Sequence, residues 1–279
     1  GDPSQMNVFH AAYRAPQPLA IPEMERMMLD LPQEPAPVIH RFGPGIYIRE
    51  VRLPGGTFAI GHEQLTEHLN IMHSGRVHMA DGTTLDATES PIIFTGKPGR
   101  KAGFIEKDTV WWNIYATTET DIEKLEATYL RKSEVFKAHS APMDDQAARE
   151  DFARMLDDLG VTADLVAEQS QNMEDQIPMP DGAYKFQTGP SPIHGRGVFS
   201  CGGYEAGEII GAANIRGYRT PLGRYTNHSG TPNARMVRDG SSIYLVALRP
   251  IEGQKGGQLG EEITVDYRQA RMEALQCLA

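Results

Sequence analysis

The sequence predicts a mainly β protein of two domains that are joined by short helices. Two stretches, 38–117 and 183–279, carry short apolar alternations interrupted by glycine and proline turn signals, a pattern typical of all-β barrels and sandwiches. Between them, residues 118–182 repeat apolar side chains at intervals of three to four, as amphipathic helices do. A chain of 279 residues is long enough for about two domains.

Charge is distributed unevenly along the chain. Residues 183–279 contain 11 Lys or Arg and 8 Asp or Glu, whereas residues 1–182 contain 16 and 29, and the whole chain has a formal charge of −10. This acidic balance argues against a general affinity for nucleic acid or for anionic membranes. The two parts are therefore expected to be physically different units.

The cysteine content and the hydropathy pattern indicate the cellular setting. Cys201 and Cys277 are too few for a zinc cluster of four sulfurs or for a disulfide framework, and we expect Cys201 to be a small core residue. The chain has no apolar run of about 18 residues and no signal-peptide pattern. We therefore expect a cytoplasmic protein without a membrane span.

The N-terminal region divides into an arm and a predicted barrel. Repeated prolines in residues 1–37 favour an extended arm with one short helix near 22–30. The barrel, residues 38–117, contains His62, Gln64 and His68, whose spacing lets them share its inner side. Side chains of this kind in such a pattern can bind a divalent metal.

The barrel stretch resembles the cupin superfamily. The resemblance rests on Gly56, His62-Glu63-Gln64, His68 and Gly75 for the first cupin motif, and on Pro98-Gly99 and Asn113 for the second. Gln64 stands where the motif has its second histidine, His68 stands where it has a glutamate, and the second motif lacks a matching histidine. We therefore favour a metal-free structural barrel, with a metal-dependent cupin enzyme that uses His62, Gln64 and His68 as the alternative. Trp111 and Trp112 are expected in the core or at an interface.

Helices are predicted in the connector, residues 118–182. The first covers 118–135, the second has Asp144 as its N-cap and Gly160 as its stop, and a third runs from Thr162 through Glu168. The apolar stripe of the second helix consists of Phe152, Met155, Leu156 and Leu159. Residues 138–182 hold 11 acidic and 2 basic residues, which suits a hydrated face, a docking surface for a basic peptide, or an internal partner of the basic C-terminal domain.

Three polar segments stand out among the C-terminal strands. Gly195 and Gly197 flank Arg196, and such a glycine pair lets backbone amides approach a ligand closely. The loop 223–233 contains Asn227 and His228 and is rich in directional hydrogen-bonding groups. The segment 261–267 is an acidic turn that leads into a strand and ends in a tyrosine. Each segment alone is compatible with an ordinary turn.

Taken together and in this order, the segments resemble the SET domain of protein lysine methyltransferases. The matching stretches are Ile193-His194-Gly195-Arg196-Gly197-Val198-Phe199, Ala206-Gly207-Glu208-Ile209-Ile210, Arg224-Tyr225-Thr226-Asn227-His228-Ser229 with Pro232-Asn233, and Glu261-Glu262-Ile263-Thr264-Val265-Asp266-Tyr267. The short spacing from Ile210 to Arg224 resembles the minimal domains of viruses and bacteria. The arrangement of both domains also resembles phage-encoded proteins, which would act in the host cytoplasm.

The resemblance implies a cofactor, a substrate and roles for particular residues. Gly195, Arg196 and Gly197 match the loop whose backbone holds S-adenosylmethionine, while Asn227 and His228, preceded by Arg224, match the motif that fixes the adenosine and amino-acid parts of this cofactor. The loop 227–229 would be crossed by the C-terminal segment. Tyr267 matches the active-site tyrosine, and the substrate would be a lysine presented by a protein. Candidates for the lysine channel, with packing as the alternative, are Tyr204, Tyr218 and Tyr225.

The chemistry of methyl transfer agrees with these roles. Transfer to an amine is an in-line displacement, so positioning is the main contribution of the enzyme, and no metal is required. A free lysine, with a pKa of about 10.4, must first lose its proton, which an apolar channel favours, and a tyrosine hydroxyl can orient the nitrogen lone pair. We expect Asp266 to be a structural hydrogen-bonding residue.

Only 12 residues follow Tyr267. The candidate sources of the channel wall are therefore the acidic helices, the barrel or a second subunit, and a homo-oligomer is possible. The loop 254–260 is expected to be mobile or to cover the site. The rival to an enzyme is a binding or structural phage protein with a SET-like module.

Overall fold

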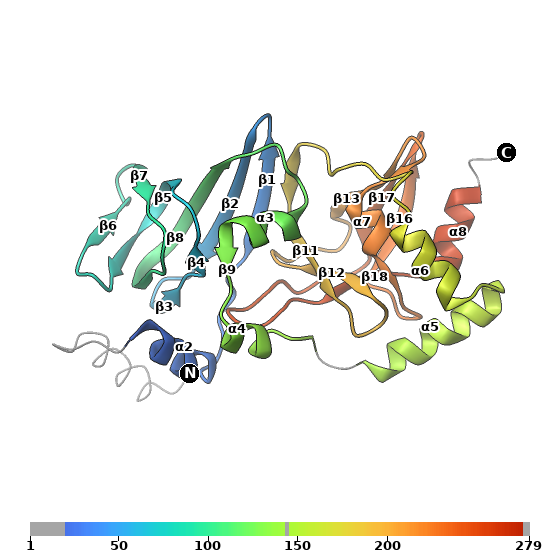
Figure 1. Ribbon diagram of the computed structural model, residues 1–279, viewed down its shortest axis with the longest axis horizontal. Coiled ribbons are helices and arrows are strands. Elements are labelled where there is room, and N and C mark those ends of the chain that lie inside the picture. The colour runs from blue at the N-terminus through green and yellow to red at the C-terminus, as the bar shows by residue number, and fades with distance from the viewer. Residues whose placement is uncertain (1–19, 143–144, 276–279) are drawn as a thin grey trace.

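The computed structural model describes residues 20–142 and 145–275, and its architecture is mainly β, which confirms the predicted fold class (Figure 1). An eight-stranded antiparallel sheet lies at one end of the molecule, and two four-stranded sheets lie at the other. Helices α2 and α4 lie beside the eight-stranded sheet, whereas α5, α6 and α8 lie beside the C-terminal sheets.

The N-terminal sheet has the order β10-β1-β2-β8-β5-β6, with β3 added to β8 and β7 added to β5. Its strands are β1 (Val38–Gly43), β2 (Ile46–Leu53), β3 (Thr57–Ile60), β5 (His68–Met79), β6 (Thr84–Asp86), β7 (Ile92–Gly96), β8 (Ala102–Ala116) and β10 (Gly182–Tyr184). The pairing of β5 with β8 shifts register around Gly75, which has φ +107 and no space for a side chain against Thr109. Such an irregularity bends a strand, and β5 thereby pairs with three neighbours along its length.

The C-terminal part forms sheets of the order β11-β12-β18-β15 and β14-β13-β17-β16. Their strands are β11 (Phe186–Pro190), β12 (Arg196–Ser200), β13 (Ile209–Ile215), β14 (Tyr218–Arg219), β15 (Asn227–His228), β16 (Ala234–Asp239), β17 (Ser242–Ala247) and β18 (Glu262–Val265). The pair β15 and β18 is parallel, although the two strands are far apart in the sequence. A parallel pair needs a long crossover connection, and here the hairpin β16–β17 is part of that connection.

The helices are α2 (Ile21–Leu29), α3 (Ile122–Tyr129), α4 (Glu134–His139), α5 (Gln146–Leu159), α6 (Ala163–Gln171), α7 (Pro221–Tyr225) and α8 (Tyr267–Leu275). The helix expected near 22–30 is confirmed as α2. The prediction of one helical stretch over 118–135 is wrong, because Leu130–Arg131 form the short strand β9 between α3 and α4. β9 pairs with β4 (Glu63–Gln64), so a long-range strand pairing overrides the local helical pattern.

Helix ends in the connector follow the expected capping chemistry. Asp144, the predicted cap of α5, lies outside the described residues, and the side chain of Asp145 accepts the backbone N–H of Ala148 at 2.9 Å. Gly160 ends α5 with φ +65, the left-handed conformation that favours glycine. The Thr162 side chain caps α6 by accepting from the backbone N–H of Leu165, which confirms both predicted signals.

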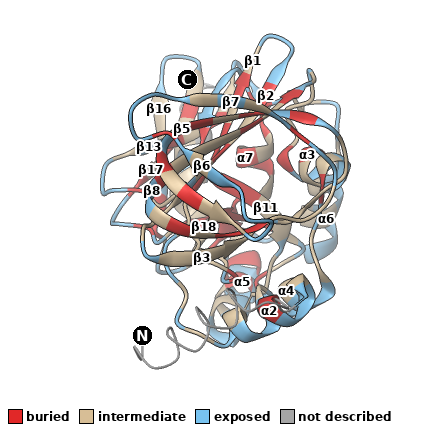
Figure 2. Ribbon diagram, turned by 90° about the vertical axis from the view of Figure 1, so that its left-hand side faces the viewer, coloured by how far each residue is buried: buried red, intermediate tan, exposed pale blue. Residues whose placement is uncertain are grey.

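The two predicted domains share strand pairing and a core. β10, at the start of the stretch 183–279, pairs with β1, and Tyr184 lies opposite His40. One hydrophobic cluster combines Phe42 and Tyr115 of the N-terminal sheet with Val198 and Leu245 of the C-terminal sheets. Figure 2 shows the buried residues along the inner strands, while the outer sides of α2 and α4 are exposed. None of the helices within the described ranges has the length and apolar character needed to cross a bilayer.

Candidate functional site

The three polar segments of the C-terminal part meet at the parallel pair β15 and β18. Asn227 lies opposite Thr264 and His228 lies opposite Val265, and the pairing continues as Ser229 N donates to the carbonyl oxygen of Val265 at 3.0 Å. On its other side, β18 pairs with β12, the strand that begins in the glycine segment. The loop, the acidic strand and the glycine segment therefore form one continuous site.

The amide of Asn227 joins these segments directly. Its Nδ2 donates to the carbonyl oxygen of His194 at 3.1 Å, to that of Arg196 at 3.0 Å, and to Oε1 of Glu262 at 2.9 Å. Asn227 is buried, so these bonds replace the water that its amide would otherwise bind. A single side chain thus holds the glycine segment against the acidic strand.

Glu262 is the second polar centre of the site. Ser191 Oγ lies 2.8 and 3.0 Å from its two carboxyl oxygens, and Gly197 leaves the space in which this carboxyl group sits. Burial raises the pKa of Glu262, while the hydrogen bonds from Asn227 and Ser191 counteract this increase. A second buried amide, Asn233, binds the same strand through the carbonyl oxygen of Glu262 and the N–H of Thr264.

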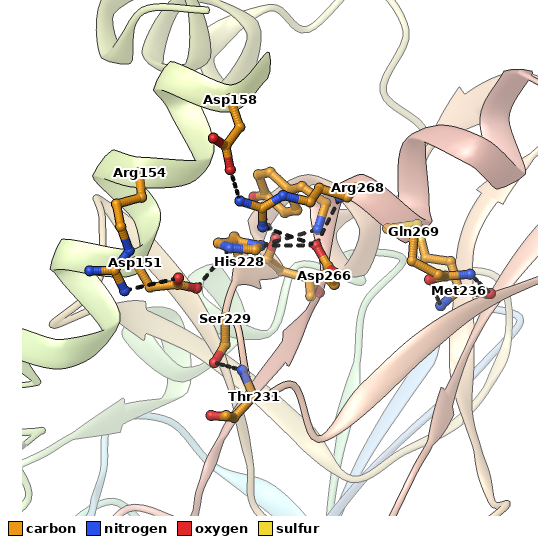
Figure 3. Close-up of polar contacts among 12 residues, drawn as sticks. Asp151, Arg154, Asp158, His228, Ser229, Thr231, Met236, Asp266, Arg268 and Gln269 are labelled. Carbon is orange, nitrogen blue, oxygen red and sulfur yellow. Dashed lines mark hydrogen bonds and ion pairs between the residues drawn. The ribbon is translucent and has the colours of Figure 1, made fainter. Parts of the chain in front are cut away.

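The hydrogen bonds of His228 define its tautomer. Tyr267 N donates to Nδ1 at 3.1 Å, so this nitrogen is the acceptor, and Nε2 carries the proton that faces Oδ2 of Asp151 at 3.0 Å. Figure 3 shows Asp151 reaching His228 from α5 while Asp266 lies on the opposite side of the ring. His228 is fully buried, and its imidazole therefore links the motif loop both to α5 and to the start of α8.

Tyr267 lies beside this imidazole, with 5.5 Å between the ring centroids. Its hydroxyl donates to the carbonyl oxygen of Thr226 at 2.9 Å, immediately before the Asn227–His228 pair. Burial raises the pKa of the Tyr267 phenol, which therefore stays protonated at neutral pH. Asp266 accepts from the backbone N–H of Arg268, a structural hydrogen bond of the expected kind.

Helix α5 covers one side of the site. Phe152 stacks on His194 at 4.9 Å between centroids, and Met155 and Leu156 pack in one cluster with Ile193 and Tyr267. The apolar stripe predicted for this helix is thus buried against the motif residues. The acidic connector, one of the three sources considered for a wall beside Tyr267, is in contact with it.

Several predicted residues lie at the edge of this site. Gly195 has φ +51 and open space where a side chain would be. The Arg196 side chain binds Glu123 of α3. Arg224 is buried and binds Gln176. The ring of Tyr225 lies 5.3 Å from the Arg196 guanidinium and 5.7 Å from that of Arg224.

The other two tyrosines considered for a channel have different surroundings. Tyr204 is buried in the shared core, with Lys185 Nζ 4.6 Å from its ring centre and a β-bridge to Ile251. Tyr218 in β14 is half exposed. Cys201 is buried as expected, and its thiol points at the carbonyl oxygen of Val38, whereas Cys277 lies outside the described residues.

The three barrel candidates for a metal have separate partners. His62 packs edge-on against Phe136, Gln64 accepts from the Tyr115 hydroxyl at 2.6 Å, and His68 Nδ1 lies 3.0 Å from the carbonyl oxygen of Thr66. Burial lowers the pKa of His62 to about 3. Across residues 20–142 and 145–275, no three His, Cys, Asp or Glu side chains are grouped as a metal would require.

Sequence reasoning did not assign roles to Asp151, Glu262 or Thr226. Glu262 was part of a matching motif, and its neighbour Gly197 is the signal that could have found it. Asp151 is one of several carboxylates on an acidic helix, and nothing in the sequence distinguishes it from Asp157 or Asp158. Its role depends on the packing of α5.

The comparison with protein-family models agrees with the motif geometry. The SET domain family model matches residues 104–268, which is more than half of the chain and includes all three polar segments. One similar solved structure is a cupin domain from Bordetella pertussis, with 14% identity, a TM-score of 0.25, and coverage of 32% of this chain and 99% of that chain. Another is an oxalate decarboxylase, with 8% identity, a TM-score of 0.24, and coverage of 84% and 69%. No curated protein matches the sequence.

Proposed function

Because this chain belongs to the SET domain family, we propose that it transfers a methyl group from S-adenosylmethionine to a lysine side chain of a protein. The observation that carries the proposal is the junction of the three motif segments. Asn227 binds the glycine segment and Glu262, while Tyr267 binds both His228 and the carbonyl oxygen of Thr226. A methyl-transfer site needs such fixed geometry, since alignment of donor and acceptor is its main means of catalysis.

The residues at the junction fit the cofactor. Among the described residues, none donates a hydrogen bond to Oδ1 of Asn227, so this oxygen can accept from an ammonium group. The carboxyl group of Glu262 lies beside it, and the open side of Gly195 lets a ligand approach the backbone. When bound, S-adenosylmethionine would supply the electrophilic methyl group of its sulfonium.

Tyr267 has the properties required to orient an amine. Its protonated hydroxyl donates to Thr226, so the lone pairs of its oxygen remain available to accept an N–H from a lysine amine. That contact would direct the nitrogen lone pair. The neighbouring Ile193 and Met155 are buried and apolar, and apolar surroundings favour the neutral amine over the ammonium form.

Helix α5 would form the wall beside this tyrosine. Its buried face contacts Ile193 and Tyr267, and its outer face bears exposed carboxylates such as Asp157. Acidic groups beside the site would attract the basic segment in which a substrate lysine is presented. We accordingly propose a basic protein segment as the partner.

The test is methyl transfer by the purified chain from radiolabelled S-adenosylmethionine to the proteins of a cell extract. Peptide mass spectrometry should place the new methyl groups on lysine. Tyr267→Phe should lower the rate by at least about tenfold, because it removes the oxygen that orients the amine. Tyr244→Phe in β17 is the matched control and should retain the wild-type rate.

Two results would overturn the proposal. One is the absence of both label incorporation and calorimetric binding of S-adenosylmethionine, which would favour the binding or structural role. The other is a Tyr267→Phe variant with the full wild-type rate, which would remove the assigned role of this tyrosine.

A further inference from the structure

A large cavity lies away from the methyl-transfer site, on the inner side of the N-terminal sheet. Its volume is about 480 Å³, which is within the usual range for small-molecule sites. The sheet supplies most of its wall, α2 and α4 contribute Met28 and Phe136, and the C-terminal part contributes Gln187 and the loop 254–259. We refer to it as the inter-domain cavity, because both parts of the chain enclose it.

The loop 254–259 is held in place at the edge of this cavity. Gln254 donates from its side chain to the carbonyl oxygen of Ala36 at 3.0 Å, and the N–H of Gly257 donates to Gln33 at 3.0 Å. The loop predicted to be mobile or to cover the site near Tyr267 therefore closes the cavity of the other domain.

A row of polar residues crosses the inner side of the sheet. Arg49 of β2 lies opposite Asn113 of β8, and Asn113 lies opposite Asn70 of β5. Oδ1 of Asn70 accepts from Nδ2 of Asn113 at 2.7 Å and from Nε1 of Trp111 at 2.9 Å, which orients its Nδ2 as the remaining donor. All four residues line the cavity.

Two donors of this row are incompletely satisfied, although Nε of Arg49 faces the carboxylate of Glu126 at 3.9 Å. Asn70 is fully buried, and neither its Nδ2 nor Nε of Arg49 makes a hydrogen bond within the described part of the chain. Nε2 of His68 shares the space over Gly96 with Nδ2 of Asn70, and the two side chains interact there. An amide nitrogen has two hydrogens, so this contact still leaves one hydrogen of Asn70 free. Unpaired buried donors are costly, and they indicate that a ligand supplies the acceptor.

The charges around the polar row favour an anion. Glu126 forms ion pairs with both Lys132 at 2.6 Å and Arg49 at 3.9 Å. Two cations therefore share one carboxylate, which leaves one positive charge in excess. Lys101 takes part in none of the ion pairs among the described residues, and burial lowers its pKa although Asp81 opposes that effect. The remaining acidic groups of the wall do not reverse the balance, because Glu25 is paired with Arg100 and Glu34 is exposed at the rim.

One part of the cavity wall is apolar. This part includes Val51, Leu53, Phe58, Val77, Met79 and Ile105, while His62, Gln64, His68 and Gln187 are further polar groups of the wall. We propose that the inter-domain cavity binds an organic acid with an apolar body, whose carboxylate accepts from Asn70 and is balanced by Arg49 and Lys101. Planar carboxylate oxygens match the unpaired N–H donors, and the apolar chain would lie against the aliphatic wall.

Calorimetric titration of the full chain with octanoate tests this proposal. Octanoate should bind in a saturable manner with one molecule per chain, and octanol and octylammonium should each bind at least about tenfold more weakly because they lack the negative charge. Asn70→Asp should weaken octanoate binding at least about tenfold, since it keeps the acceptor for Trp111 and Asn113 but replaces the donor with a like charge. Asn214→Asp in β13 adds the same charge elsewhere and should change the affinity less than about twofold.

A second pair of variants covers the case in which Asn70→Asp does not fold. Lys101→Met should also weaken octanoate binding, and Lys107→Met, on an exposed part of β8, should not. The proposal fails if octanoate does not bind, if octanol binds equally well, or if both cavity variants keep the wild-type affinity. None of these results depends on methyl transfer, so this test and that of the methyltransferase proposal can fail separately.

Discussion

Replacement of Asn227 by alanine tests whether its amide holds the three motif segments together. The two hydrogens of Nδ2 serve two carbonyl oxygens and the carboxyl group of Glu262. A hydrogen bond to a charged group contributes about 1.5–3 kcal/mol and one to a neutral carbonyl about 0.5–1.5 kcal/mol. Asn227→Ala should therefore lower the free energy of unfolding by about 2–4.5 kcal/mol.

For a chain of this size, that loss corresponds to a fall in Tm of about 5–15 °C. Differential scanning calorimetry at neutral pH measures this fall in Tm. The control is Asn214→Ala, because the Asn214 side chain accepts one exposed hydrogen bond from Gly217. This bond should contribute about 1 kcal/mol or less to stability. Asn227→Ala should also reduce the increase in Tm that S-adenosylmethionine produces in the wild type. A Tm for Asn227→Ala within about 2 °C of the wild type would refute the role of the amide.

Two further predictions concern the neighbours of Asn227. Asp151→Ala leaves the buried Nε2–H of His228 unpaired, so we expect the free energy of unfolding to fall by about 1–3 kcal/mol. Amide hydrogen exchange along α5 should become faster, whereas the control Asp157→Ala, at an exposed position, should leave it unchanged. Unchanged exchange in Asp151→Ala would contradict the contact with His228. The raised pKa of Glu262 means that the folded state binds this proton more tightly, so its contribution to stability is present below its ordinary pKa of 4.5 and is lost as the pH rises through the raised value. Glutamine at this position does not titrate, so the free energy of unfolding of Glu262→Gln minus that of the wild type should increase between about pH 4 and pH 7. Urea titrations measure this difference, and a value independent of pH would argue against the raised pKa.

Local features of the sequence predicted much of the fold. The short helix α2, the αL stop at Gly160 and the cap at Thr162 depend on a few neighbouring residues, and all three are confirmed. The short apolar alternations of residues 183–279 predicted β structure, and the strands β11 to β18 are observed there. The prediction over 118–135 failed at Leu130–Arg131, where pairing with β4 replaces the helix.

The motif order was also sufficient to predict which residues of the C-terminal part come together. His228 is in contact with Tyr267, and Asn227 and His228 pair with β18, the strand that precedes this tyrosine. The family resemblance implied this crossing of the two segments. Arg196 and Arg224 show the limit of this reasoning, since their side chains bind Glu123 and Gln176. A motif predicts the course of the backbone at these positions more directly than the direction of a long side chain.

The amino-acid pattern specifies strands, caps and motifs, because propensity and periodicity act between residues that are close along the chain. Only the tertiary structure brings Asp151 into contact with His228, β10 beside β1, and the loop 254–259 to the edge of a cavity lined by Arg49 and Asn70. These contacts join residues far apart in the sequence, and they form where the packing of whole helices and sheets leaves a buried group in need of a partner. No pattern within one segment contains that information.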